Sequence, residues 1–174
     1  GEPSIGLDGA LQGDLDVLTS VTILGSGTDK TTINADSLDR VFQVFPNKTL
    51  KLIDLTITGG KTNDGMGGGG ILSSGNLLLD NVVITGNETD KNGGGLLSEP
   101  NSSVTALKSI FSENVSEEDG GGIYIDNSSK ADFNKVDILR NKITPPDTLI
   151  DTSGKDVKGG GIFIGPNVEA TIIE

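Results

Sequence analysis

The sequence has no cysteine, no histidine and no tryptophan, and its aromatic residues are limited to five phenylalanines and one tyrosine. Without cysteine, the chain has neither disulfide bridges nor thiolate metal sites. Basic residues are also scarce, since 13 Lys and Arg face 25 Asp and Glu and give a net charge of −12. Such a chain repels phosphate backbones and anionic lipids, so we expect no nucleic-acid partner. No apolar run approaches the roughly 18 residues of a membrane span, so we expect no membrane insertion in this segment.

Glycine is abundant, with 26 residues in a chain of 174. This length suits one domain, and a hydrophobic content of 33% supports a core that must be mainly aliphatic. The glycines are not scattered as in a flexible linker, because four triplets recur along the chain. The triplets are Gly68–Gly70, Gly93–Gly95, Gly120–Gly122 and Gly159–Gly161.

Alternating apolar residues recur between the triplets with a fixed spacing of 27 residues. Leu50, Leu77, Val104 and Ala131 follow one another at this interval, and the same column continues at Ala170 after 39 residues. A second column with the 27-residue spacing consists of Ile57, Ile84, Phe111 and Ile138. Period-two alternation within each unit predicts short strands. The longer last interval indicates one insertion.

A third apolar column follows the triplets and contains one irregularity. Its members are Phe42, Ile71, Leu96, Ile123 and Ile162. Ile71 lies two residues out of register, and a shortened turn at Ser74 and Gly75 explains this shift.

One such unit cannot bury its apolar face, whereas stacked units can, with strands about 4.8 Å apart along the axis. We therefore predict an all-β fold, a single-stranded right-handed parallel β-helix of about five to six coils. Residues 1–174 form one domain, in which 1–40 are irregular first coils, 41–174 are regular coils, and 142–158 are a long loop insertion. We expect the chain to be a fragment of a larger protein.

Polar residues also follow the repeat. Asn87, Asn114 and Asn141 are 27 residues apart, and we expect their amides to stack inside a corner and to have a structural role. Three acidic residues, Asp90, Glu117 and Asp156, each lie three residues before a triplet. On neighbouring coils this acidic column either binds Ca²⁺, which prefers oxygen ligands, or forms a solvated acidic edge. No other cofactor is expected.

Catalytic residues are not apparent in the pattern. Parallel β-helices often contain lyases and hydrolases that act on polysaccharides with several Asp and an Arg or Lys. Here the two arginines, Arg40 and Arg140, fall on different coils and on opposite sides of the repeat. We assign no catalytic residue and treat an enzyme as the alternative to a binding or structural protein.

Three features suggest contact surfaces. The outward positions Thr56, Val83, Ile110 and Asp137 form a column whose middle is apolar. The long loop 142–158 replaces five-residue turns, and insertions of repeat proteins gather on binding faces. The last strand, at residues 169–174, leaves an open edge that invites pairing with more chain or with another molecule.

Several segments resemble bacterial surface proteins named for a CSLREA segment. The similar stretches are Gly13–Asp16, Thr22–Gly25, Asp39–Phe42 and Leu55–Gly60, together with the Gly-Gly-Gly-Ile units. The cysteine-bearing segment that gives the family its name is absent from this chain. Phe111–Asn114 beside Gly120–Ile123 is also similar to the FxxN and GGAI repeats of polymorphic outer-membrane proteins.

The resemblance implies an extracellular or cell-surface location and a large, adhesive protein. The matching positions are glycines, strand aliphatics and corner asparagines, so no catalytic residue transfers. From these points we expect a secreted or cell-surface structural, adhesive β-helix stalk that can associate end to end with its own copies. Its partner is a glycan or a surface protein. The alternative is a β-helix that binds or degrades polysaccharides.

Overall fold

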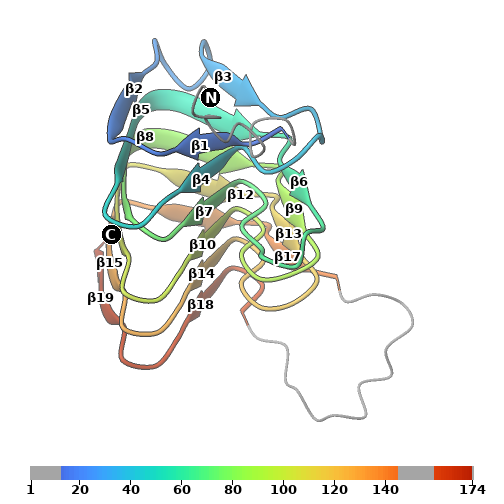
Figure 1. Cartoon of the computed structure of the whole chain (residues 1–174), viewed down its shortest axis with the longest axis vertical. Coiled ribbons are helices and arrows are strands. Elements are labelled where there is room, and N and C mark those ends of the chain that lie inside the picture. Colours follow the sequence, from blue (N-terminus) through green and yellow to red (C-terminus); the bar gives the residue numbers. More distant parts are fainter. Residues whose placement is uncertain (1–12, 145–158, 174) are drawn as a thin grey trace, which may run out of the picture.

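The chain winds into a solenoid made of strands (Figure 1). This computed structural model describes residues 13–144 and 159–173, in which there are 19 strands and no helix. The strands form three sheets that run along the axis of the solenoid, and neighbouring strands in all three are parallel. The described part therefore contains no helix long enough to span a membrane.

Each turn of the chain contributes strands to the three sheets in succession. Sheet A consists of β1 (Leu15–Val17), β4 (Phe42–Val44), β7 (Ile71–Ser73), β10 (Leu96–Ser98), β14 (Ile123–Ile125) and β18 (Ile162–Ile164). Sheet B consists of β2 (Val21–Leu24), β3 (Thr32–Asn34), β5 (Thr49–Thr58), β8 (Asn76–Thr85), β11 (Ser103–Leu107), β12 (Ile110–Ser112), β15 (Lys130–Asn134), β16 (Asp137–Leu139) and β19 (Glu169–Ile173). Sheet C consists of β6 (Lys61–Thr62), β9 (Glu88–Thr89), β13 (Val115–Ser116) and β17 (Lys142–Ile143).

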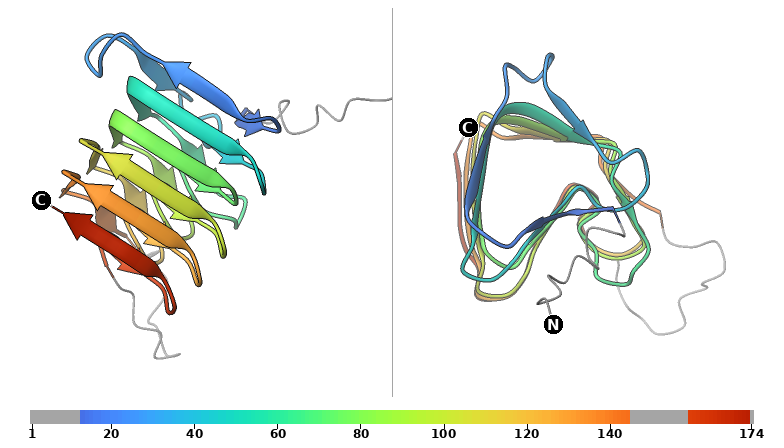
Figure 2. Two further views of the ribbon diagram at one scale, coloured as in Figure 1. Left: turned by 90° about the vertical axis from the view of Figure 1, so that its left-hand side faces the viewer. Right: turned by 45° about the horizontal axis from the view of Figure 1, so that its top comes forward.

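The 27-residue repeat is the register of the sheets. Leu50 pairs with Leu77, Leu77 with Val104, and Val104 with Ala131. Ala131 then pairs with Ala170, because the segment that joins β17 to β18 is twelve residues longer than the one that joins β13 to β14. In the left view of Figure 2, strands from successive coils lie side by side in the same direction. The predicted parallel β-helix is confirmed.

Side chains of the repeat pile up inside the coil and exclude water. Leu50, Leu77, Val104 and Ala131 are each at most 1% exposed. The second column is equally buried at Ile57, Ile84 and Phe111, and both columns belong to one hydrophobic cluster. Like side chains stack because each coil repeats the one below it at the strand spacing of about 4.8 Å. The core is therefore continuous along the axis.

The glycine triplets form a corner between sheet C and sheet A. The first glycine of each triplet has a positive φ, from 65° at Gly120 to 72° at Gly159. The next glycine lies against the neighbouring coil, since a Cβ at Gly94 would come within 2.4 Å of the carbonyl oxygen of Gly121. Glycine meets both requirements without steric cost, the left-handed backbone at the first position and the close approach of two chains at the second.

The first described coil departs from the regular shape of the later coils. β5 pairs with two separate strands of that coil, Val21 with Leu50 and Thr32 with Thr56. The intervening chain bulges outward, and the hydroxyl of Thr56 donates a hydrogen bond to the carbonyl of Thr28 at 2.8 Å. In the right view of Figure 2, the later coils overlie one another while the first coil lies apart.

The corner between sheet A and sheet B contains the shortened turn. Four residues join β4 to β5 and β10 to β11, but only Ser74 and Gly75 join β7 to β8. Sheet A shifts accordingly, because Phe42 pairs with Ile71 and Ile71 with Leu96. The predicted register shift and its cause are both confirmed.

Candidate functional site

The asparagine column forms a ladder of hydrogen bonds at the corner between sheet B and sheet C. The side-chain amide of Asn87 donates to Oδ1 of Asn114 at 2.9 Å, and that of Asn114 donates to Oδ1 of Asn141 at 3.0 Å. At the upper end, the N–H of Gly60 donates to Oδ1 of Asn87 at 2.9 Å. Asn87 and Asn114 are 0% exposed, so these amides lie between consecutive coils and away from solvent.

The acidic column is only partly described by the structure. Asp90 and Glu117 lie at equivalent positions on adjacent coils, since their N–H groups donate to the carbonyls of Thr62 and Thr89. Asp156 lies outside the described residues. The Oδ1 atom of Asp90 is buried and accepts no hydrogen bond from the described part of the chain. No group of three or more acidic residues within 13–144 and 159–173 is arranged to hold a metal ion. Calcium binding stays a prediction.

A buried arginine occupies the first coils. Arg40 is 1% exposed and its Nε donates to Oδ2 of Asp14 at 3.1 Å. Its other donors reach the carboxylate of Asp64 and, at 2.6 Å, the carbonyl of Gly67. Burial and the nearby Asp16 raise the pKa of Asp14, although Arg40 acts in the opposite direction. The cluster ties three segments of the first coils together.

Sequence reasoning missed this cluster, although one signal for it was present. In the parallel register, Arg40 takes the position that the middle glycine of a triplet occupies in later coils. A long charged residue in a column of glycines marks this corner as different from the later ones.

Other ion pairs join one coil to the next on the surface. Arg140 donates to Oε1 of Glu113 at 2.8 Å, and Lys91 lies 2.9 Å from Oε1 of Glu118. The hydrogen bond from Lys91 to Glu118 raises the pKa of that lysine. Two further pairs of this kind are Lys61–Glu88 and Lys130–Glu169. Exposed pairs of this kind contribute little each, up to about 1 kcal/mol.

The residues of the predicted outward column pair with one another along sheet B. Thr56 pairs with Val83, Val83 with Ile110, and Ile110 with Asp137. The first three side chains are half-buried and Asp137 is exposed. A second outward pair lies on sheet A, where the rings of Tyr124 and Phe163 stack with centroids 4.7 Å apart.

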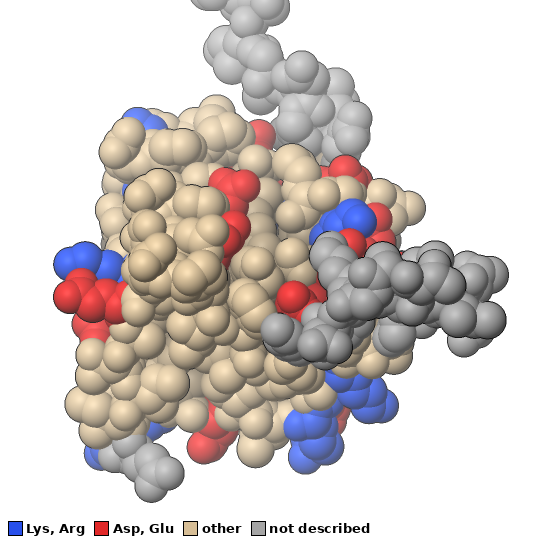
Figure 3. All heavy atoms as spheres, turned by 90° about the horizontal axis from the view of Figure 1, so that it is seen from below, with Lys and Arg blue, Asp and Glu red and all other residues tan. Residues whose placement is uncertain are grey.

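The lower end of the described chain exposes positions that are buried elsewhere. Ile172 continues the inward column of Phe133, yet it is 61% exposed whereas Phe133 is 2% exposed. Ile164 likewise continues the column of Ile125 and is 38% exposed. Seen from below, this face carries mostly uncharged atoms; basic side chains lie toward its edges, and some acidic side chains lie among the uncharged atoms (Figure 3). The lower end of the described chain thus combines the edge of a sheet with exposed apolar side chains.

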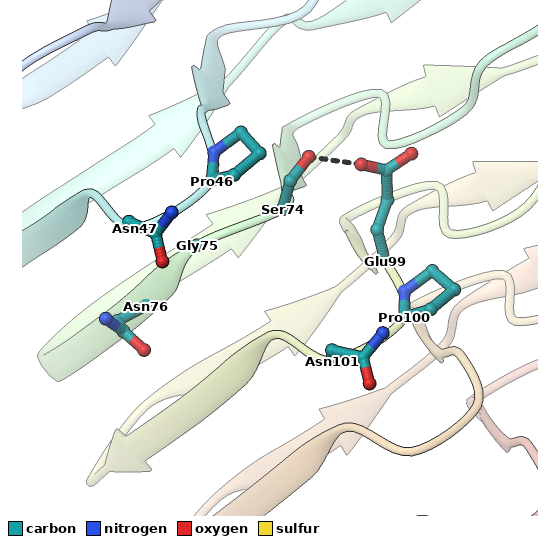
Figure 4. Close-up of a pocket in the computed structure, with 8 residues that line it drawn as sticks. All are labelled: Pro46, Asn47, Ser74, Gly75, Asn76, Glu99, Pro100 and Asn101. Atoms are coloured by element: carbon teal, nitrogen blue, oxygen red, sulfur yellow. Dashed lines mark hydrogen bonds between the residues drawn. The ribbon is translucent and has the colours of Figure 1, made fainter.

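A notch lies at the corner where the turn is shortened. It has a volume of about 400 Å³ and is lined by Pro46, Asn47, Ser74, Gly75, Asn76, Glu99, Pro100 and Asn101. The two Pro-Asn turns flank the notch, and Ser74 lies between them with its hydroxyl donating to the carboxylate of Glu99 (Figure 4). We call this site the corner notch. Sequence reasoning identified the deletion but not the hollow that it leaves.

Parallel sheets, stacked interior columns and a fixed repeat define a parallel β-helix. Comparison with known families agrees, because residues 21–173 match the family described as right handed beta helix region. The chain belongs to this family, and the predicted hand is the hand of the family. Neither a curated protein nor a solved structure matches the chain significantly.

Proposed function

We propose that this chain is a structural, adhesive β-helix stalk of the cell surface, and that its copies associate end to end. The observation that carries the proposal is that both arginines are paired with acidic residues between coils. Arg40 is buried against acidic residues of its own and adjacent coils, and Arg140 is paired with Glu113 of the neighbouring coil. Both arginines are thus engaged between coils, and the buried Arg40 ties segments of the first coils together, as a rod requires. A polysaccharide-active enzyme uses such groups in a shared cleft.

The ends of the coil support stacking between copies. Among residues 13–144 and 159–173, β18 and β19 each pair with a strand on one side only and border an apolar surface, and Leu15 and Val21 are 50% and 40% exposed at the other end. Inside the molecule, every coil already stacks on a coil of similar shape in parallel register. A second copy placed below the last coil repeats this contact. Such a head-to-tail contact is heterologous and extends into a filament.

Sedimentation velocity over a range of protein concentrations tests this proposal. We expect the weight-average sedimentation coefficient to rise with concentration. Ile172→Lys places a charge in the inward column at the open end and should abolish the rise. Ile173→Lys is the matched control, because Ile173 is 52% exposed but pairs with the outward position Asn134. A protein that is monomeric at every concentration, or two variants that behave alike, would count against stacking.

The surface location and the enzymatic alternative have their own tests. The resemblance to bacterial surface proteins supports export, so an antibody against the chain should label intact cells. An enzyme instead predicts unsaturated products or new reducing ends when the protein is incubated with a panel of polysaccharides. Such products would show that the protein is a lyase or a hydrolase and would contradict the proposed role as a stalk.

A further inference from the structure

The corner notch exists because one coil lacks part of a turn. The full turns at this corner place a residue with positive φ at their third position, namely Asn47 (62°), Asn101 (63°), Ser128 (59°) and Asn167 (57°). In the coil between Asn47 and Asn101, the two middle residues of the turn are absent. The turns that carry Pro46 and Pro100 are consequently two coil spacings apart, about 9.6 Å.

The missing residues also interrupt a row of hydrogen bonds between turns. Below the notch, the N–H of Asn101 donates to the carbonyl of Asn127 at 3.3 Å, and that of Ser128 donates to the carbonyl of Pro166 at 3.4 Å. By the same register, the N–H of Asn47 and the carbonyl of Pro100 lack their partners. Neither group has a hydrogen bond to any residue in 13–144 or 159–173. The notch is thus bordered by one donor and one acceptor.

A single amide group supplies both partners. In a full turn, the missing carbonyl and the missing N–H belong to one peptide group, because they come from successive residues. An amide that enters the gap accepts from Asn47 and donates to Pro100, and the gap leaves room for one layer of about 4.8 Å. Proline rings border the gap on both sides, and a methyl group on the amide packs against them.

The rim of the notch offers further polar groups. The carboxylate of Glu99 accepts from Ser74 and has a second oxygen for another donor. Asn76 is exposed on the floor, where its Oδ1 accepts from the hydroxyl of Ser103 at 2.7 Å. A hydroxyl group both donates and accepts, so a ring bearing several hydroxyls can pair with this mixture of groups. A plain peptide uses the backbone pair and leaves the rim unused.

We propose that the corner notch binds an acetamido sugar, with N-acetylglucosamine as the simplest example. The acetamido group lies between Asn47 and Pro100, and the ring hydroxyls face Glu99 and Asn76. The volume of about 400 Å³ is at the lower end of the range of small-ligand sites. The notch lies on the side of the solenoid, so this binding does not depend on stacking through the ends, and the two proposals fail separately.

The test is a titration of the isotope-labelled protein followed by amide NMR. We expect the methyl glycoside of N-acetylglucosamine to cause saturable shifts at Asn47, Gly75 and Asn101, with a Kd in the millimolar range. Glucose and glucosamine, which lack the amide, should bind at least tenfold more weakly. Equal shifts with glucose would overturn the role of the amide, and no shift with any sugar would overturn the site. Binding of triglycine in place of the sugar would show a peptide site and overturn the sugar class.

Two variants locate the binding. Insertion of Pro-Asn between Ser74 and Gly75 completes the turn and fills the notch, so binding should be lost. Glu99→Gln keeps the size of the side chain but removes its charge, and should weaken binding at least fivefold while the amide spectrum stays folded. Undiminished binding in the folded insertion variant, or in Glu99→Gln if the insertion does not fold, would overturn the location.

Discussion

Asn114→Ala is the substitution that most directly tests the asparagine ladder. Oδ1 of Asn114 accepts from the backbone N–H of Asn87 at 3.1 Å and from its side-chain amide at 2.9 Å. The amide of Asn114 donates to the carbonyl of Ile84 at 2.9 Å and to Oδ1 of Asn141 at 3.0 Å. The substitution therefore removes four hydrogen bonds at a site that is 0% exposed.

The expected cost follows from the number of bonds and from burial. A hydrogen bond contributes about 1 kcal/mol net, and a buried group left without a partner costs about 1–3 kcal/mol. Two of the partners keep another bond, since the amide of Asn87 also donates to the carbonyl of Thr85 and Oδ1 of Asn141 also accepts from the N–H of Asn114. We therefore count about 1 kcal/mol for each of the four lost bonds, and expect Asn114→Ala to lower the free energy of unfolding by about 4 kcal/mol.

Urea unfolding followed by circular dichroism measures this loss, and Asn76→Ala is the matched control. Asn76 also bonds to neighbouring coils, accepting from Ser103 at 2.7 Å and donating to Thr49 at 3.5 Å, but it is exposed. Its replacement should cost less than about 1 kcal/mol, because water takes the place of the lost partners. If the two variants lost the same free energy, the ladder would contribute no more than surface contacts, and the reasoning would be refuted.

Arg40→Ala should lower the free energy of unfolding by about 3–5 kcal/mol, because it leaves buried carboxylate charge unpaired, whereas Arg140→Ala at the surface should cost less than about 1 kcal/mol; equal losses in urea unfolding would contradict this. Asp14 has a raised pKa, so the folded state binds its proton more tightly than the unfolded state. Stability from this group is complete below its ordinary pKa and is lost as the pH rises through the raised value, so the wild type should lose stability relative to Asp14→Asn as the pH rises above the ordinary range of a carboxyl group. If the acidic column binds calcium, millimolar Ca²⁺ should raise the melting midpoint and a chelator should reverse the rise; an unchanged midpoint would remove calcium from consideration.

The regular part of the fold could be predicted because its register is visible in the sequence. A parallel solenoid places residues one repeat apart in contact, so the 27-residue spacing of Leu50, Leu77 and Val104 directly predicts which residues pair. The turn at Ser74 and Gly75 could be predicted for the same reason, since a deletion shifts one column and leaves the next in place. Stacking of Asn87 on Asn114 follows from the same arithmetic.

The contacts of side chains that do not repeat could not be predicted from the spacing. Arg40 has no equivalent on other coils, and its partners Asp14 and Asp64 come from segments at irregular spacing. Its burial depends on the course of the first coil, which the repeat does not determine. The corner notch was missed for a related reason, because a register locates a deletion along the chain but does not show which groups the deletion leaves open.

Departures from the repeat are therefore the places where the surface differs from one coil to the next. A regular coil presents the same row of side chains on each turn, and its turns satisfy one another through bonds such as that from Asn101 to Asn127. Removing two residues beside Gly75 leaves a donor at Asn47 and an acceptor at Pro100 that no neighbouring coil satisfies. The deletion costs the fold little, because β7 and β8 keep their parallel partners on both sides. A solenoid can thus gain a binding site by losing part of a turn while its core columns stay unchanged.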